Sequence, residues 1–337
     1  MLDIIEQIPD GLLDIPLRDL HRILPGPTLL HLPGRKPEPL FVSVILHGNE
    51  GAGFRAVQSV LKSYSNRELP RALSVFFGNV SAAREGVRRL PGQPDYNRIW
   101  PGAEDNSLPE HAMAQAVIGE MRQRKVFAAI DVHNNTGFNP HYACVNRLGQ
   151  PFLHFARLFS RTVVFFERPL GVISSAVADL CPAVAVECGK PDNTLGDTQA
   201  AEFIEAGLHL SEFPAHALPA SDIDLYHTIG IVTVPQEIGL GRTPAGTYVQ
   251  FEDNIDHLNF RDLPAGTRLA HAQRTSTVPL LVRDDEGRIV TNDYLELRDD
   301  EILTRRDIMP AMLTLDERVI RQDCLCYFME RMRYPVA

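Results

Sequence analysis

Residues 41–53 read Phe-Val-Ser-Val-Ile-Leu-His-Gly-Asn-Glu-Gly-Ala-Gly. An apolar run rich in β-branched residues ends at His47, and a Gly-Asn turn separates it from Glu50. The pattern predicts a buried strand, a tight turn and the start of a helix. Such a turn can aim the imidazole of His47 and the carboxylate of Glu50 at one point, and zinc accepts both ligand types. Because a His-x-x-Glu pair occurs by chance in many chains, the rest of the sequence must supply further ligands.

This stretch is one of several apolar strands that alternate with helices over the first two thirds of the chain. The expected strands are 28–32, 40–46, 72–77, 126–132, 161–166 and 183–186, and the expected helices are 51–64, 110–125, 151–160 and 198–210. Helical turns are expected before residue 27, a polar turn at 34–39 and an irregular segment at 81–98. Apolar strands that alternate with helices indicate an α/β domain with a largely parallel sheet.

The character of the chain changes near residues 214–219. Beyond them, short strands separated by Gly, Pro and Asp turns are expected at 230–234, 247–250, 267–270, 279–282, 289–290 and 302–304. A chain of 337 residues suits two domains. We therefore expect a first domain over residues 1–220 and a smaller β-rich domain over residues 221–337.

Composition excludes several classes of protein. The formal net charge of -10 argues against a nucleic-acid-binding protein, which would need a basic face. The five cysteines form no C-x-x-C pair, and the amino terminus does not read as a signal peptide. No apolar stretch approaches the ~18 residues of a membrane span. A reducing, cytoplasmic setting is therefore expected, with no membrane partner.

Two further residues stand where strands end. His133 closes the strand 126–132, and two histidines with one glutamate match a catalytic zinc site that keeps a fourth position for water. Asp131 is a candidate for orienting one ligand. Glu187 follows the strand 183–186 and is a candidate general base. The alternative for each histidine is a structural role in which its hydrogen bonds are satisfied at the strand end. The alternative for Glu187 is a carboxylate that caps a helix or pairs with Lys190.

Arginines gather in the irregular segment. Arg84, Arg88 and Arg89 precede Asp95-Tyr-Asn97-Arg98, and a guanidinium beside an asparagine can hold a carboxylate. In an acidic chain this cluster favours an anion pocket, although a solvated basic run is the ordinary alternative.

Taken together, these motifs resemble the succinylglutamate desuccinylase/aspartoacylase family, which is related to the zinc carboxypeptidases. The resemblance rests on five motifs in order: His47-Gly-Asn-Glu50, Gly78-Asn79 followed by Arg88, Asn97-Arg98 with Pro101-Gly102, Asp131-Val-His133-Asn-Asn-Thr136, and Glu187-Cys-Gly-Lys190. In the β-rich part it includes Asn259-Phe-Arg261, Ala265-Gly266 and Met309-Pro-Ala-Met-Leu-Thr314. It implies a zinc carboxypeptidase-like α/β/α sandwich with a mostly parallel mixed sheet, and a second domain that caps the site.

The resemblance also implies roles for individual residues. His47, Glu50 and His133 would bind one Zn²⁺ per chain. Glu187 would act as the base on a zinc-bound water, and Arg88 would stabilise the oxyanion, an effect often worth ~3 kcal/mol. The remaining expected substrate-binding residues are Asn97, Arg98 and, in the second domain, Tyr294. The implied reaction is the hydrolysis of a small anionic N-acyl amino acid.

The sequence departs from the aspartoacylase pattern at two places. Two extra residues separate Arg88 from Asn97-Arg98, so Arg84 and Arg89 stay open as the oxyanion-stabilising residue. The region before Glu187 reads Ser174-Ser-Ala-Val177 and lacks a second arginine, so N-acetylaspartate is not the expected substrate. The rival functions are a zinc carboxypeptidase that cleaves peptides and a non-catalytic binding protein on the same fold. The acyl group, the amine and the oligomeric state stay open, and a homo-oligomer is compatible with the sequence.

Overall fold

The computed structural model describes residues 2–241 and 246–334. The chain divides into two compact units. Of the described residues, the first contains 2–134, 141–225 and 334, and the second contains 135–140, 226–241 and 246–333. The segment 135–140 therefore leaves the first unit directly after the strand that ends at His133.

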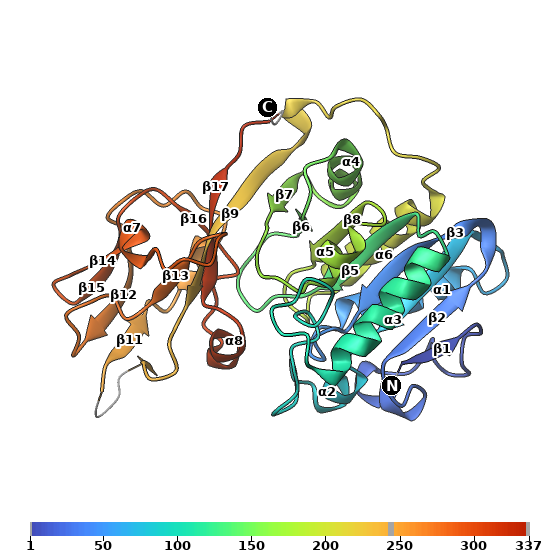
Figure 1. The fold of residues 1–337 in the computed structure, drawn as a ribbon, viewed down its shortest axis with the longest axis horizontal. Helices are drawn as coiled ribbons and strands as arrows, with labels where there is room; N and C mark the ends of the chain where they lie inside the picture. Colours follow the sequence, from blue (N-terminus) through green and yellow to red (C-terminus); the bar gives the residue numbers. More distant parts are fainter. Residues whose placement is uncertain (1, 242–245, 335–337) are drawn as a thin grey trace. The chain divides into compact units, whose positions relative to one another are not determined.

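A twisted sheet forms the middle of the first unit (Figure 1). Its strands lie in the order β1-β2-β4-β3-β5-β8-β6-β7, and only the β2–β4 and β6–β8 pairs are antiparallel. Their bounds are β1 (Asp3–Ile5), β2 (Thr28–Leu32), β3 (Gly34–Val44), β4 (Leu69–Phe77), β5 (Ala128–His133), β6 (Tyr142–Val145), β7 (Thr162–Phe165) and β8 (Ala183–Glu187). The central strands β3, β5 and β8 are parallel, so their carboxyl ends meet at one edge.

Helices cover both faces of this sheet (Figure 1). They are α1 (Ala52–Ser63), α2 (Val80–Glu85), α3 (Pro109–Gln123), α4 (Gln150–Phe159), α5 (Ile173–Val177), α6 (Thr194–His209) and two 3₁₀ turns, η1 (Leu17–Arg22) and η2 (Ala220–Asp222). Gly53 of α1 packs on Val44, and Gly207 of α6 packs on Leu40. On the other face, Phe41 clusters with Val117 of α3 and Val177 of α5. Alternate residues of one strand thus face opposite helical layers, which makes an α/β/α sandwich.

Local expectations differ from the structure in a few places. Residues 34–39, expected as a turn, begin β3 and pair with β4. Residues 3–5, expected within helical turns, form β1 beside β2. Residues 80–85 of the segment expected to be irregular form α2, whose first turn is capped by Asn79. Tertiary pairing outweighs weak local preference at such short elements.

The second unit is built mainly of strands. One group contains β9 (Asp224–Thr233), β13 (Leu281–Arg283), β16 (Met309–Ala311) and β17 (Cys326–Arg331), and it is antiparallel. The other follows the order β10-β11-β12-β15-β14, with β10 (Gly239–Leu240), β11 (Tyr248–Phe251), β12 (Arg268–Gln273), β14 (Leu295–Arg298) and β15 (Glu301–Thr304). Short helices α7 (Thr291–Tyr294), α8 (Glu317–Gln322) and η3 (Ile255–Leu258) complete it. Both groups contribute to one apolar core that includes Val232, Ala270 and Phe328.

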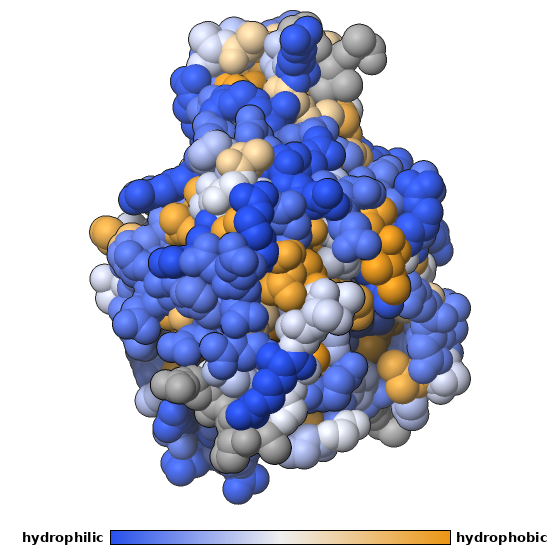
Figure 2. Space-filling view, turned by 90° about the vertical axis from the view of Figure 1, so that its left-hand side faces the viewer, coloured by the Kyte–Doolittle hydropathy of each residue, from blue (hydrophilic) through white to orange (hydrophobic). Residues whose placement is uncertain are grey.

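The surface shown in Figure 2 is mostly hydrophilic, with hydrophobic residues interspersed in small groups. Within residues 2–241 and 246–334, none of the helices combines the length and apolar character that crossing a membrane requires.

Candidate metal centre and active site

The turn after β3 carries two of the predicted ligands. The amide of Glu50 donates to the carbonyl of His47 at 3.1 Å, which closes the turn. Gly48 packs directly against the backbone of α2, and its amide donates to the carbonyl of Arg88 at 3.1 Å. The side chain of Asn134 then accepts from the amide of Ala52 at 3.0 Å, where α1 begins. These contacts fix the turn between the ends of β3 and β5.

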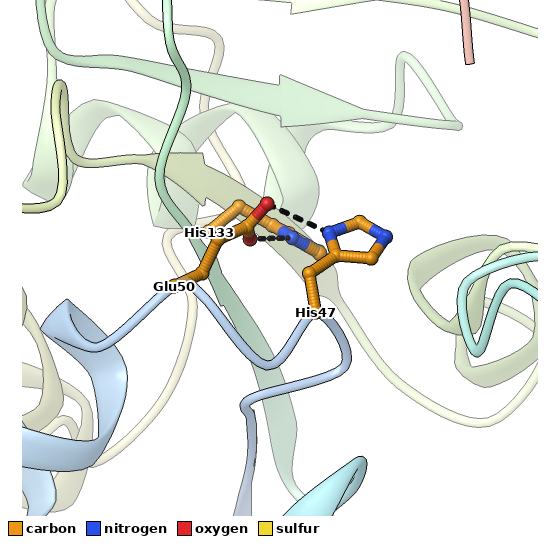
Figure 3. Close-up of side chains that lie close together, drawn as sticks. All are labelled: His47, Glu50 and His133. Carbon is orange, nitrogen blue, oxygen red and sulfur yellow. Dashed lines mark hydrogen bonds and ion pairs between the residues drawn. The ribbon is translucent and has the colours of Figure 1, made fainter. Parts of the chain in front are cut away.

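His133, at the end of β5, completes a buried cluster with His47 and Glu50 (Figure 3). One carboxylate oxygen of Glu50 lies 2.8 Å from Nδ1 of His47, and the other lies 2.8 Å from Nδ1 of His133. One potential ligand atom from each residue lies within 4.8 Å of the others. The structure thus brings together three residues that are separated by up to 86 positions in the sequence.

The opposite ring nitrogens of both histidines face other carboxylates. Nε2 of His47 lies 3.0 Å from Oδ1 of Asp95, and Nε2 of His133 lies 2.7 Å from Oδ2 of Asp131. Asp131 also accepts a hydrogen bond from the hydroxyl of Ser43. A carboxylate on Nε2 keeps the proton there and leaves the lone pair of Nδ1 for a metal, as is usual for metal-binding histidines.

The electrostatics of the cluster are those of a cation site. Burial by itself lowers the pKa of each imidazole, but Glu50 and Asp95 raise that of His47, and Asp131 and Glu50 raise that of His133, above the ordinary value. Burial raises the pKa of Glu50, yet both imidazoles hold it far below its usual range. The carboxylates therefore favour positive charge between them. Two imidazole nitrogens and a carboxylate oxygen, all buried, fit a zinc ion.

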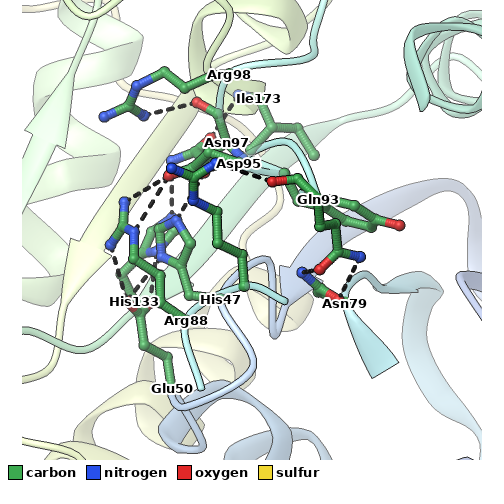
Figure 4. Close-up of polar contacts among 12 residues, drawn as sticks. His47, Glu50, Asn79, Arg88, Gln93, Asp95, Asn97, Arg98, His133 and Ile173 are labelled. Atoms are coloured by element: carbon green, nitrogen blue, oxygen red, sulfur yellow. Dashed lines mark hydrogen bonds and ion pairs between the residues drawn. The ribbon is translucent and has the colours of Figure 1, made fainter. Parts of the chain in front are cut away.

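Arg88 is the one of the three candidate arginines with a contact to a predicted ligand among the described residues. Its Nη1 lies 3.8 Å from Glu50, and its Nη2 donates to Asp95 at 2.9 Å (Figure 4). The exposed Arg84 pairs with Glu85, and Arg89 donates to the carbonyl of Gln93. The side chain of Arg88 is 11% exposed, so it is held within the site.

Asn97 and Arg98 border the same cluster (Figure 4). The amide nitrogen of Asn97 lies 3.3 Å from Nε2 of His133, and its amide oxygen accepts from the backbone of Ile173 at 3.1 Å. Nη1 of Arg98 donates to the backbone carbonyl of Asn97 at 2.8 Å. Asp95 positions this segment because its side chain also accepts a hydrogen bond from the backbone N–H of Asn97 at 2.8 Å.

Glu187 ends β8 beside His133, and the two residues are register partners. Its side chain is buried, as expected for a carboxylate at this edge of the sheet. The amide of Cys188 donates to the carbonyl of His133 at 2.9 Å, and the side chain of Asn134 donates to the carbonyl of Gly189. These bonds hold the segment after Glu187 against the end of β5.

Tyr294 belongs to the second unit. Its hydroxyl lies 3.4 Å from the carbonyl of Ile229, and its ring packs near Phe328 and under the guanidinium of Arg306. These contacts account for its burial within that unit. Its predicted role in substrate binding stays a prediction.

Asp95 and Asn134 contact the candidate site although their motifs alone do not predict these contacts. Asp95 contacts His47 across 48 positions, and Asn134 caps a helix that begins 82 positions before it. In the sequence, only their proximity to candidate site residues points to them. Asp95 lies two positions before Asn97, and Asn134 directly follows His133.

The fold and the buried cluster define an α/β protein with a candidate metal site at the carboxyl edge of its sheet. Residues 38–211 match the family described as the succinylglutamate desuccinylase/aspartoacylase catalytic domain. This match spans more than half of the 337 residues, and the chain belongs to that family. Its members are deacylases, which hydrolyse amide bonds. No curated protein matches the chain in sequence.

Solved structures share the fold at low sequence identity. The succinylglutamate desuccinylase of Chromobacterium violaceum has a TM-score of 0.57 and 18% identity over 90% of this chain and 87% of its own. That of Vibrio parahaemolyticus has a TM-score of 0.60 and 15% identity over 89% and 84%. Murine aminoacylase 3 has a TM-score of 0.55 and 14% identity over 88% and 96%. The predicted α/β/α fold with a β-rich C-terminal part is confirmed.

Proposed function

We propose that this protein is a zinc-dependent hydrolase that cleaves the amide bond of a small N-acyl amino acid. The observation that carries the proposal is the buried cluster of His47, Glu50 and His133, in which each imidazole Nδ1 lies 2.8 Å from Glu50. Membership of a deacylase family supports the reaction type. A bound zinc ion would supply positive charge that favours ionisation of the attacking water and polarises the scissile carbonyl.

Glu187 is the proposed general base. It stands at the end of β8 as the register partner of His133, so its carboxylate belongs to the same sheet edge as the metal ligands. Burial suits a carboxylate that must accept a proton from the attacking water and then pass it to the leaving amine. The products are a carboxylic acid and a free amine.

Arg88 is the proposed oxyanion-stabilising residue. Its contact with Glu50 and its two bonds to Asp95 support this choice over Arg84 and Arg89. A guanidinium fixed by a carboxylate is preorganised, so it stabilises developing negative charge without first reorienting.

Asn97 and Arg98 are proposed to bind the carboxylate of the substrate. The segment that holds them is anchored to Asp95 and Ile173, which keeps both next to His133. Tyr294 is kept as a proposed contributor from the second unit, within a domain over residues 221–337 proposed to cap the site. No disulfide joins the cysteines of the described residues, which supports the proposed cytoplasmic setting.

Replacement of the base tests the proposal. Glu187→Gln keeps the size of the side chain but removes the proton acceptor. We expect loss of amine release from N-acyl amino acids while one zinc per chain is retained. The exposed Glu202→Gln on α6 is the matched control and should keep full activity. Undiminished activity of Glu187→Gln would show that Glu187 is not the general base.

The carboxypeptidase alternative is separated by substrate choice. A panel of N-acyl amino acids and short peptides, assayed by amine release, should show turnover of the acylated amino acids only. Preferential cleavage of the peptides would replace the deacylase proposal with the peptidase one. Failure of the native protein to retain zinc would revive a non-catalytic binding role.

A further inference from the structure

A cavity of about 390 Å³ lies at the edge of the first unit's sheet opposite the candidate active site. Its wall is formed where β3, β4, β5 and β8 begin, whereas the predicted ligands and Glu187 stand where β3, β5 and β8 end. Lys36, Arg71, Lys125, Phe127, Leu180 and Cys181 line it. All of these residues belong to the first unit. The volume is in the range of small-molecule sites.

Arg71 is the central polar group of this cavity. It is 2% exposed, and its guanidinium lies 3.6 Å above the ring of Phe127. Nη1 donates to the carbonyl of Glu38 at 2.8 Å, and Nη2 donates to that of Leu210 at 3.0 Å. Among the residues that the structure describes, the buried Nε has no hydrogen-bond partner. A buried donor left without a partner destabilises the folded protein.

The charges around the cavity are mainly positive. Lys36 is the register partner of Arg71, and Lys125 contributes a second ammonium group. Glu38 is the only acidic residue that lines the cavity within the described part of the chain. Burial lowers the pKa of Arg71, and the charge of Glu38 opposes this shift. The positive charge of the guanidinium is therefore balanced only in part. Three cations beside one carboxylate form a local basic site in a protein of net charge -10.

The backbone at Lys125 is a further unusual feature. This residue follows the end of α3 with a φ of 54°, a conformation that favours glycine or asparagine at a helix end. Lysine adopts it only at a cost in conformational free energy. The conformation directs the chain from α3 into β5, beside the cavity.

A purely structural role explains part of this arrangement. The two bonds from Arg71 join the start of β3 to the segment after α6, and the Phe127 ring stacks on Phe213 at 5.0 Å. That role accounts for the burial of Arg71. It leaves the unpartnered Nε and the two lysines around an open volume unexplained.

We propose that this cavity binds a short-chain monocarboxylate. The carboxylate pairs with the ammonium groups of Lys36 and Lys125, and the buried guanidinium of Arg71 adds positive charge behind them. The aliphatic tail packs along the apolar part of the lining, which includes Leu180, Cys181 and Pro182. The site is separate from the catalytic edge, so it does not depend on the proposed function.

Hexanoate is a suitable probe because it combines one carboxylate with a short aliphatic tail. We expect isothermal titration to detect its binding to the full chain. The double variant Lys36→Gln/Lys125→Asn should bind it about tenfold more weakly at low salt, because it removes the charges of the half-buried Lys36 and the exposed Lys125 and leaves the core intact. Asparagine is chosen at position 125 because it tolerates the left-handed conformation.

Control variants separate this cavity from the active site and from general charge effects. Lys62→Gln removes a lysine on α1 that pairs with Asp14, and it should leave hexanoate affinity unchanged. Arg98→Gln alters the proposed carboxylate clamp of the active site and should also leave it unchanged. Equal affinity of the double variant and the parent would overturn the proposal. A loss with Arg98→Gln would instead assign the binding to the active site.

Two further ligands test the chemistry of recognition. Hexanol has the tail without the charge, and inorganic phosphate has the charge without the tail. Both should bind more weakly than hexanoate. Equal binding of hexanol would overturn recognition of an anion, and equal binding of phosphate would overturn recognition of the tail.

Discussion

Nε2 of His47 lies 3.0 Å from Oδ1 of Asp95, and the second oxygen of the same carboxylate accepts from Arg88 at 2.9 Å. One buried side chain therefore orients a proposed metal ligand and the proposed oxyanion-stabilising arginine together. Burial raises the pKa of Asp95, but Arg88 and His47 hold it well below its ordinary range. Asp95 is thus a charged positioning residue between the two halves of the proposed site.

Asp95→Asn should weaken zinc binding. The amide cannot hold the proton on Nε2 of His47 as a carboxylate does, and the loss of such a partner typically costs about 10–100-fold in metal affinity. Competition with a chelator measures the change. The exposed Asp105→Asn, in the segment before α3, is the control and should bind zinc as the parent does. Equal affinity of the two variants would contradict the positioning role.

Arg88→Lys should reduce kcat by about 10²-fold, which corresponds to the loss of one oxyanion donor. Lysine keeps the charge but cannot form the two bonds by which Arg88 holds Asp95. Arg84→Lys and Arg89→Lys, made in parallel, should change kcat little. Steady-state kinetics that place the large loss at either of these positions would show that Arg88 is the wrong assignment.

Gly48→Ala should destabilise the protein and disturb the turn between His47 and Glu50. An added Cβ would lie 2.2 Å from backbone atoms of both Ala82 and Ala83, so α2 or the turn must move. We expect a loss of about 3 kcal/mol in the free energy of unfolding, with reduced zinc content. At Gly26 nothing lies within 4 Å of the corresponding Cβ, and Gly26→Ala is the control. Denaturant unfolding that gives equal stabilities would refute the close approach.

His31 predicts a pH dependence of stability. Burial, followed by the charge of Arg124, lowers its pKa to about 4 from the model-peptide value of 6.5. Between these values the unfolded chain binds more protons, so stability falls as the pH is lowered from about 6.5 to 4. This group contributes up to about 3 kcal/mol of that loss. Unfolding measured at pH 7 and pH 4.5 should show a flatter profile for His31→Gln. The control His216→Gln, which replaces an exposed histidine, should leave the profile unchanged.

The regular elements around the site were largely predictable from the sequence. The strands ending near His47, at His133 and before Glu187 are predominantly apolar, and their parallel packing gathers these residues at one edge. Short elements were not predictable. β6 has four residues and α5 has five, so neither offers enough periodicity to distinguish it from a loop.

The site itself was only partly predictable. The expectation that His47, Glu50 and His133 converge agrees with the geometry because each follows a strand end. The role of Asp95 was not apparent, since it depends on how an irregular loop folds back over the β3 turn. The choice among Arg84, Arg88 and Arg89 likewise depended on side-chain directions, which spacing alone does not determine.

The central claim is that a zinc ion held by His47, Glu50 and His133 is required for deacylation. The most direct measurement combines zinc content with amine release from N-acyl amino acids, before and after removal of the metal by a chelator. We expect one zinc per chain, loss of amine release with the metal, and recovery when zinc is restored. Full activity of the metal-free protein, or no amine release from any N-acyl amino acid by the zinc-loaded protein, would contradict the account.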